Sequence, residues 1–411
     1  MEDNVRKIIE KEMKGCFDYF WYESNTDLID GFGLTKDKTT SRICSIAAIG
    51  FAFCAYVIGV ERGYISFREG YERVLKTLNT LKRIETHHGF FPHFIDPILL
   101  KRYRSEYSTI DTTILFCGGV VAGEYFRGEV KQIINGFIND LDWNYFLETR
   151  DGKKQINMAY SPKIWQETKG FCPATWDQYA EQLMMYLLIA GEDKISKDEA
   201  IDLFNGFTRH KDKYYGIEVI HCFANPLFIH QFSHAFFPFQ DYLDTNSFDW
   251  FKNSINACRA NRLYCINQKR FKTYGPNSWG LTAFLGEDGY KVFGSKPFGL
   301  PNIKYKQKLD GSVAPYAALC SINFIEEEVI DAIKYFDTIP NLFGKYGFTD
   351  SYNLDTGFVS DVYIGIDKGP TIVMLDNYLN GTTWKYFTQS EIIKKAIDKL
   401  NFKKKEKKNE N

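Results

Sequence analysis

Two kinds of helical segment alternate along the 411-residue chain, and this alternation constrains the fold more than any other feature. Residues 42–60 are apolar on nearly every face, so a helix there must be buried on all sides. Residues 66–82 follow, with Phe67, Tyr71 and Leu78 at helical spacing among polar residues, which predicts an amphipathic helix that covers the buried one. This pairing recurs about six times and predicts an all-α fold, an (α/α)6 toroid with a double ring of alternating inner and outer helices.

The expected elements share a pattern rather than sequence identity. A polar or aromatic start followed by apolar residues marks the buried segments, at 42–60, 105–121, 175–191, 230–241, 274–285, 310–319 and 369–375. Covering helices are expected at 4–22, 66–82, 125–137, 248–267, 326–336 and 391–400, and another from Ser196. An open α-solenoid is the alternative, but it would show more nearly equal repeats and shorter loops than the one at 142–173. Long loops of that kind are typical of binding and catalytic sites.

The stretch at 175–191 is predicted as one helix with two unlike halves. Its second half is apolar and ends at Gly191, the residue type that most readily closes a helix. Its first half places Asp177 and Glu181 one turn apart, next to Trp176. Carboxylates beside aromatic residues at the start of a buried helix indicate a carbohydrate site. A polar surface stripe, or a buried carboxylate paired with an Arg, would give the same pattern.

The composition excludes some classes of function. A formal net charge of −1 gives no electrostatic bias toward nucleic acid. The apolar fraction of 44% lets the chain bury a large core. The aromatic fraction of 17% fits a protein that stacks rings on sugars, although the codon usage of a low-GC genome would explain it equally well.

The cysteines and the N-terminus predict the compartment. The nine cysteines form no C-x-x-C pair and no zinc-ligand spacing with the seven histidines. Free, buried thiols are expected, which indicates a reducing compartment or an anaerobic organism. The N-terminus shows no secretion signal, so a cytoplasmic protein is expected, with export of a longer precursor as the alternative. The longest apolar run, 43–60, contains Ser45 and small residues and is interpreted as a buried helix rather than a membrane span.

Five ordered motifs in the second half of the chain carry a family resemblance. They are YGPNSWGLTA at 274–283, EDGY at 287–290, DGSVAPY at 310–316, YGFTDSYN at 346–353 and GIDKGP at 365–370. Their succession resembles the glucoamylase-like domain of glycoside hydrolase family 144, the β-1,2-glucanases, and is similar to a domain of cyclic β-1,2-glucan synthases. The likeness extends from about Asp30 to Trp384. It implies an (α/α)6 fold and hydrolysis of β-1,2-glucan or its oligosaccharides.

The resemblance also implies catalytic roles for particular carboxylates. Glu181 resembles the family's catalytic acid. Asp111, within the matching text at 108–112, is the preferred partner carboxylate. Glu106 is the third candidate and could instead bind a sugar hydroxyl or orient Arg104. Because members of the wider group place the catalytic base on a later loop, three more carboxylates stay open as the base: Asp350, Asp361 and Asp367.

Glycoside hydrolysis needs two carboxyl groups in different protonation states. One must stay protonated near neutral pH, which requires burial or a like-charged neighbour, and Asp177 would be such a neighbour for Glu181. The other must be ionised to activate water or to attack the anomeric carbon, and the separation of the two decides the stereochemical outcome. This chemistry requires no metal and no cofactor.

Aromatic and polar residues near the predicted helix starts are candidates for substrate binding. Stacking on glucose is assigned to Tyr274, Trp279, Phe91, Tyr160, Trp165, Trp176 and Phe232. Contacts to hydroxyl groups are assigned to Asn277, His93, Asp177, His230, Gln231, Gln240 and Asn353. Core packing is the ordinary role of any single aromatic residue, and Tyr274 and Trp279 are the exceptions that the densest motif favours.

Two functions from different classes follow. The first is a glycoside hydrolase acting on a β-glucan or gluco-oligosaccharide with paired carboxylates. The second is a non-hydrolytic β-glucan-binding or transglycosylating module related to cyclic β-1,2-glucan synthase. A prenyl transferase subunit or terpene cyclase would need an Asp-rich or zinc-ligand pattern that the sequence lacks. One catalytic domain is expected over residues 1–402, with a disordered basic tail over 403–411.

Overall fold

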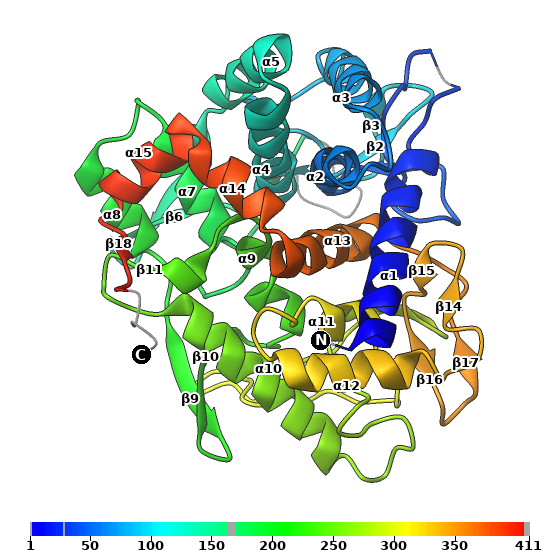
Figure 1. The fold of residues 1–411 in the computed structure, drawn as a ribbon. Helices are drawn as coiled ribbons and strands as arrows, with labels where there is room; N and C mark the ends of the chain where they lie inside the picture. Colours follow the sequence, from blue (N-terminus) through cyan, green and yellow to red (C-terminus); the bar gives the residue numbers. More distant parts are fainter. Residues whose placement is uncertain (1, 28, 163–169, 407–411) are drawn as a thin grey trace.

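The computed structural model describes residues 2–27, 29–162 and 170–406, and it is rich in α-helices (Figure 1). The helices that are buried on nearly all sides are α2 (Ile46–Glu61), α4 (Thr109–Phe126), α7 (Leu183–Gly191), α9 (Phe232–Phe236), α11 (Pro315–Leu319) and α13 (Gly365–Leu379). Helices with an exposed face alternate with them: α1 (Asp3–Tyr22), α3 (Phe67–Leu81), α5 (Gly128–Asn139), α8 (Lys197–Phe204), α10 (Trp250–Asn267), α12 (Glu326–Phe336), α14 (Thr382–Gln389) and α15 (Glu391–Lys399). The predicted alternation of buried and covering helices is confirmed.

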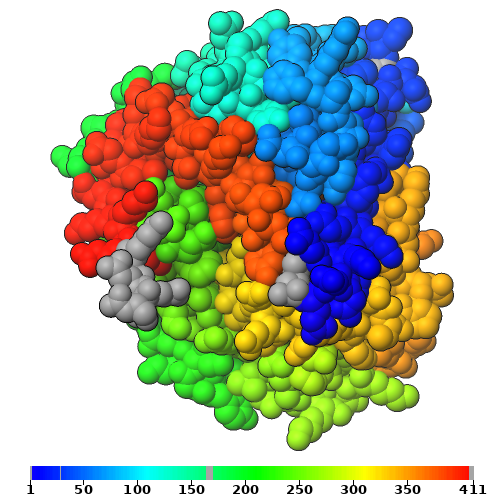
Figure 2. All heavy atoms as spheres, in the orientation of Figure 1, coloured from blue at the N-terminus to red at the C-terminus, as the bar shows by residue number. Residues whose placement is uncertain are grey.

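Helix α2 joins the two ends of the chain in one core. It packs against α4 and α13, and α1 packs against both α2 and α13. In the space-filling view of the same face, the N-terminal helix lies against segments from the C-terminal half of the chain (Figure 2). Helices α2 and α4 meet at their backbones, because a Cβ on Gly118 would lie 1.8 Å from the carbonyl oxygen of Gly50. Glycine is therefore required where these helices cross.

Side-chain caps fix where several helices begin. Ser66 and Glu69 form a reciprocal capping box at α3, and Ser196 and Glu199 form another at α8. At α4 the Ser108 hydroxyl accepts the N–H of the third helical residue. These caps satisfy amide groups that the first helical turn leaves without partners.

The strands are short and form hairpins and small sheets between the helices. They are β1 (Cys44–Ser45), β2 (Phe94–Asp96), β3 (Lys101–Arg102), β4 (Tyr107–Ser108), β5 (Leu147–Arg150), β6 (Lys153–Ile156), β7 (Ala159–Ser161), β8 (Gly170–Phe171), β9 (His210–Tyr214), β10 (Ile217–His221), β11 (Tyr242–Leu243), β12 (Ala283–Gly286), β13 (Gly289–Val292), β14 (Phe343–Gly344), β15 (Gly347–Phe348), β16 (Tyr352–Asn353), β17 (Phe358–Val359) and β18 (Lys403–Lys404). Within the described ranges, no sheet has more than three strands. The predicted long loop at 142–173 holds β5 to β8 and a single helical turn, α6 (Trp143–Phe146).

The prediction of one helix over 175–191 is wrong in its first half. Helix α7 begins at Leu183, and the residues before it run along other segments. Thr175 pairs with Asn157 and Gln178 pairs with Thr208 in isolated bridges. These long-range pairings replace the helical hydrogen bonds that the local pattern predicted.

The buried helix predicted at 274–285 is also absent from the described structure. Residues 275–278 form a turn, and strand β12 follows at Ala283–Gly286. Gly280, with φ of +133°, lies where helical backbone would need a negative φ. The segment at 230–241 is likewise divided, into η1 (Leu227–His230), α9 and η2 (Phe239–Asp241).

The start of the predicted basic tail is ordered. Lys403 and Lys404 form β18, which pairs antiparallel with Tyr242 and Leu243 of β11. The Lys405 ammonium lies 2.8 Å from Asp249. The backbone of residues 403–405 therefore bonds to the protein although the side chains of Lys403 and Lys404 are exposed, and residues 407–411 lie outside the described residues.

All nine cysteines are free, and seven of them are buried, as the sequence predicts. Among the described helices, none combines the length and the apolar character that a membrane crossing needs.

Candidate active site

A cavity of about 450 Å³ lies where the buried helices begin. Several of these helices contribute a residue from the first turn or from just before it: Asp111 at α4, Glu181 at α7, Phe232 at α9, Tyr316 at α11 and Asp367 at α13. The volume is within the range of sites for small molecules. Five of the buried helices therefore place a residue at one cavity, whereas none of the lining residues belongs to α2.

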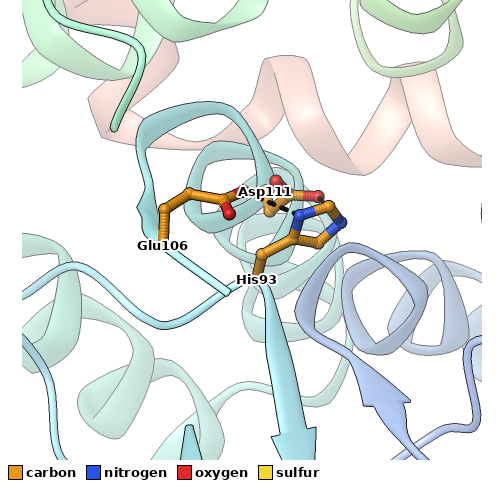
Figure 3. Close-up of side chains that lie close together, drawn as sticks. All are labelled: His93, Glu106 and Asp111. Atoms are coloured by element: carbon orange, nitrogen blue, oxygen red, sulfur yellow. Dashed lines mark hydrogen bonds and ion pairs between the residues drawn. The ribbon is translucent and has the colours of Figure 1, made fainter. Parts of the chain in front are cut away.

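His93, Glu106 and Asp111 form one cluster at the wall of the cavity (Figure 3). The Nδ1 atom of His93 lies 2.8 Å from Oε1 of Glu106, and its Nε2 atom lies 3.6 Å from Oδ1 of Asp111. The Ser108 hydroxyl donates to Oδ2 of Asp111 at 2.5 Å. The histidine ring therefore bridges two carboxylates, and the cap of α4 holds one of them in place.

The neighbouring carboxylates keep the imidazole of His93 protonated. Burial alone would lower the pKa of His93, but Asp111, Glu106 and Asp37 together raise it to about 9. Burial would raise the pKa of Glu106, but the hydrogen bond and the charge of His93 outweigh it and hold that pKa below its usual value. At neutral pH the cluster is an imidazolium between carboxylates.

The carboxyl group of Glu181 has a different environment. Burial raises the pKa of Glu181 to about 7, the negative charge of Asp111 adds to the increase, and a backbone hydrogen bond opposes it. The hydroxyl of Ser233 donates to the carbonyl oxygen of Glu181 and holds the residue ahead of α7. Asp177, predicted as the like-charged neighbour, is exposed and lies outside any helix. Asp111 is instead the carboxylate whose charge acts on Glu181.

Asp350 and Asp367 form a second carboxyl pair beside the cavity. Burial raises the pKa of Asp350 to about 6 and that of Asp367 well above its usual value. A hydrogen bond between the two carboxyls lowers the pKa of Asp350 and raises that of Asp367. The backbone N–H of Leu285 also donates to Oδ2 of Asp350 at 2.6 Å. The hydrogen bond between the two carboxyls therefore favours the protonated form of Asp367 over that of Asp350.

A buried ion pair lies behind these two aspartates. The Lys368 ammonium lies 2.8 Å from Oε1 of Glu12 and also donates to the carbonyl oxygen of Phe348. Lys368 and Glu12 are 4% and 1% exposed, so water screens the pair little. The positive charge of Lys368 is one of the influences that lower the pKa of Asp350. Helix α1 is in this way connected to the carboxyl pair beside the cavity.

The structure brings together part of the predicted site. Glu181, Asp111, His93 and Phe232 line the cavity, and Glu106 contacts it through His93. The sequence leaves three carboxylates open as the base. Asp367 lines the cavity, and Asp350 is hydrogen-bonded to Asp367. Asp361 is exposed and lines a separate pocket.

Among the described residues, the others predicted to bind sugar are not part of the cavity lining. Four aromatic side chains lie in the hydrophobic core: Tyr274, Trp279, Phe91 and Trp176. Three buried polar side chains bind groups within the protein: His230, Gln231 and Asn353. Four residues lie partly or fully exposed at other places: Asn277, Tyr160, Gln240 and Asp177. Trp165 lies outside the described residues.

The cluster in Figure 3 also has the composition of a metal site. One ligand atom from each of His93, Glu106 and Asp111 can be chosen so that all three lie within 4.8 Å of one another. Their hydrogen bond and ion pairs already satisfy the imidazole, so the arrangement is complete as a proton-bearing cluster.

Two cavity residues lie in motifs of the sequence but are not among the predicted site residues. Tyr290 ends the EDGY motif and Tyr316 ends the DGSVAPY motif, and both line the cavity. Asp37 lies on the same wall as His93 and raises its pKa. Only the pairing of distant segments brings these residues together, so no local spacing could have identified them.

Comparisons with known proteins agree with this architecture. Residues 173–391 match the Glycoamylase family model, whose description is "Putative glucoamylase". An exo-β-1,2-glucooligosaccharide sophorohydrolase (non-reducing end) of Parabacteroides distasonis is 25% identical over 438 aligned residues, which include 96% of this chain. The chain spans 58% of the length of that relative.

Two solved structures are similar over nearly the whole chain. An endo-β-1,2-glucanase of Chitinophaga pinensis, in complex with sophorotriose and glucose, has a TM-score of 0.82 and 26% identity and covers 97% of this chain and 98% of its own. A β-1,2-glucanase of Parabacteroides distasonis has a TM-score of 0.82 and 24% identity and covers 96% of this chain and 60% of its own. With more than half of its length matched by the family model and a cavity formed at the starts of its buried helices, this chain belongs to the glucoamylase-like family.

Proposed function

We propose that this protein is a glycoside hydrolase that cleaves β-1,2-glucan or β-1,2-linked gluco-oligosaccharides. The observation that carries the proposal is Glu181, a carboxyl at the cavity wall whose pKa is raised to about 7 beside the carboxylate Asp111. A carboxyl whose pKa lies near neutral pH, next to a second carboxyl, forms the pair that glycosidic hydrolysis needs. The substrate is assigned from relatives that act on β-1,2-linked glucose.

Glu181 is the general acid in this proposal. Its proton passes to the glycosidic oxygen as the bond to the anomeric carbon breaks, so that the leaving sugar departs as a neutral alcohol. Asp111 is the ionised partner, which either takes a proton from the attacking water or bonds to the anomeric carbon before water replaces it. In the first case the proton lost by water balances the one that Glu181 gives up.

His93 and Glu106 support Asp111 in this proposal. The imidazolium faces Asp111 at 3.6 Å, and Glu106 holds the other ring nitrogen at 2.8 Å. A cation beside Asp111 favours the ionised form of that carboxyl, whereas burial favours the protonated form of Glu181. The pair Asp350 and Asp367 is the alternative source of the base, because Asp350 is the member that ionises first.

We also propose how the helices of the whole chain are arranged. Buried and covering helices that alternate, with the buried starts around one cavity, support an (α/α)6 toroid. One catalytic domain is proposed over the ordered chain, because α1 packs against α13 and residues 403–404 pair with β11.

The test is incubation of the purified protein with linear β-1,2-glucan and with short β-1,2-linked oligosaccharides, followed by measurement of new reducing ends and product sizes. We expect products from the unmodified protein and none from Glu181→Gln, with product sizes that separate exo from endo attack. If neither protein releases products while both bind the glucan, the non-hydrolytic binding or transglycosylating function replaces this proposal.

A further inference from the structure

The hairpin formed by β12 and β13 lines the cavity and carries an exposed tyrosine, Tyr290. Leu285 of β12 lies directly opposite Tyr290 of β13, and Ala283 lies two residues before Leu285 on the same face of the strand. All three residues line the cavity. This face of the hairpin is therefore part of the cavity wall.

Tyr290 differs from the other aromatic residues of the cavity in its exposure. It is 65% exposed, whereas Phe232 and Tyr316 are 4% and 6% exposed. Within the described part of the chain, its ring stacks on no other aromatic ring and its hydroxyl makes no hydrogen bond. Packing in the core therefore does not explain the residue, because none of the described residues stacks on its ring or bonds to its hydroxyl.

The phenol end of Tyr290 is within electrostatic reach of the carboxyl groups around the cavity. Burial of that end and the charges of Asp367, Asp350 and Asp37 raise the pKa of the phenol above its usual value. Glu181 contributes in the same direction. Tyr290 is thus largely exposed to solvent and at the same time part of the cavity that holds the carboxyl groups of the proposed reaction.

The hairpin is held rigidly in this position. The backbone of Leu285 bonds to Asp350 through its N–H and to the Ser351 hydroxyl through its carbonyl oxygen, each at 2.6 Å. The ammonium of Lys291, the neighbour of Tyr290, bonds to Asp310. A ring presented on an anchored hairpin loses little conformational freedom when a ligand binds.

We propose that Tyr290 is a sugar-stacking and positioning residue, whose ring covers one pyranose face at the mouth of the cavity while its hydroxyl binds a hydroxyl group of the same sugar. This inference rests on the proposed function and adds to it a specificity element that recognises an uncharged pyranose. An aromatic face suits the C–H groups of a glucose ring, and a free phenol suits its hydroxyl groups.

The experiment measures binding in the Glu181→Gln background, where the ligand is not consumed. Sophorotriose is titrated by calorimetry into that variant alone and into versions that also carry Tyr290→Ala, Tyr290→Phe or Tyr290→Trp. We expect the dissociation constant to rise about tenfold for Tyr290→Ala, less for Tyr290→Phe, and little for Tyr290→Trp, because tryptophan keeps a stacking face.

Tyr215 provides a matched control. It is 78% exposed beside Gly216 at the turn of another hairpin, between β9 and β10, and it does not line the cavity. Tyr215→Ala in the same background should bind sophorotriose as tightly as the parent, and circular dichroism should show that every variant is folded. In the otherwise unmodified enzyme, Tyr290→Ala should raise KM more than it lowers kcat.

The outcomes separate this inference from the function on which it rests. Equal affinity of Tyr290→Ala and its parent would overturn the role of Tyr290 while leaving hydrolysis intact. A loss of affinity of the same size in Tyr215→Ala would also overturn it, because the effect would then not belong to the cavity. If the unmodified protein neither binds nor cleaves β-1,2-linked glucose, the proposed function fails and this inference fails with it.

Discussion

Replacing Glu181 by glutamine is predicted to stabilise the fold while it abolishes activity. In the unfolded chain the carboxyl ionises near its ordinary value of 4.5, whereas in the folded protein its pKa is about 7. The folded state therefore binds the proton more tightly. The stability that this preference contributes is fully present below pH 4.5 and is lost as the pH rises through 7. Glutamine has nearly the same shape and cannot ionise, so the variant does not incur this loss.

The magnitude follows from the two pKa values. At 1.36 kcal/mol for each pH unit, the difference between 4.5 and 7 limits the effect to about 3 kcal/mol. The advantage of Glu181→Gln in the free energy of unfolding should be about 3 kcal/mol at pH 8 and below about 1 kcal/mol at pH 5. The partial exposure of the side chain makes these values upper limits.

Urea unfolding of both proteins at the two pH values measures the difference. Glu327→Gln, at an exposed position on α12, is the control and should change stability equally at both pH values. An advantage of Glu181→Gln that does not grow between pH 5 and pH 8 would refute the claim that burial keeps this carboxyl protonated.

Four other substitutions and titrations examine separate parts of the structure. Asp111→Asn should lower kcat at least about 100-fold with sophorotriose binding retained, and an unchanged kcat would move the base to the second carboxyl pair. An NMR titration should show the His93 imidazolium losing its proton near pH 9, and a midpoint at the usual histidine value would contradict the cluster. Glu12→Gln leaves the ammonium of Lys368 buried without its carboxylate, so urea unfolding should show a loss of about 3–5 kcal/mol in the free energy of unfolding. A loss below about 1 kcal/mol, as for an exposed ion pair, would disprove the burial argument. Gly118→Ala places a methyl group against α2 and should cost about 1–3 kcal/mol in the same assay, whereas an unchanged midpoint would mean that the helices separate freely.

Local sequence predicts the helices whose signals are local. The amphipathic helices α1, α3, α10 and α12 lie within two residues of their predicted limits, because apolar spacing and cap residues define them. The segment at 175–182 is predicted as helix because Asp177 and Glu181 are one helical turn apart and lead into an apolar run. Its bridges to Asn157 and Thr208 depend on chain segments about 20 to 30 residues away, which no local pattern contains.

The difference between local signals and long-range pairing also explains which site residues the sequence predicts. Glu181 and Asp111 are predicted because each lies at the start of an expected buried helix in text that resembles the family, and both line the cavity. Tyr274 and Trp279 lie in an equally dense motif, yet both are buried in the core, because motif density does not say which face of a segment meets the cavity. Tyr290 reaches the cavity through the pairing of β12 with β13 and the anchoring of that hairpin to Asp350.

The pH dependence of kcat/KM on linear β-1,2-glucan tests the central claim most directly. If Glu181 is the general acid, its proton is required, and kcat/KM should fall tenfold for each pH unit above about 7. Release of reducing ends that stays constant up to about pH 9, or the absence of any release from this glucan, would contradict the claim that Glu181 acts as the acid of a β-1,2-glucan hydrolase.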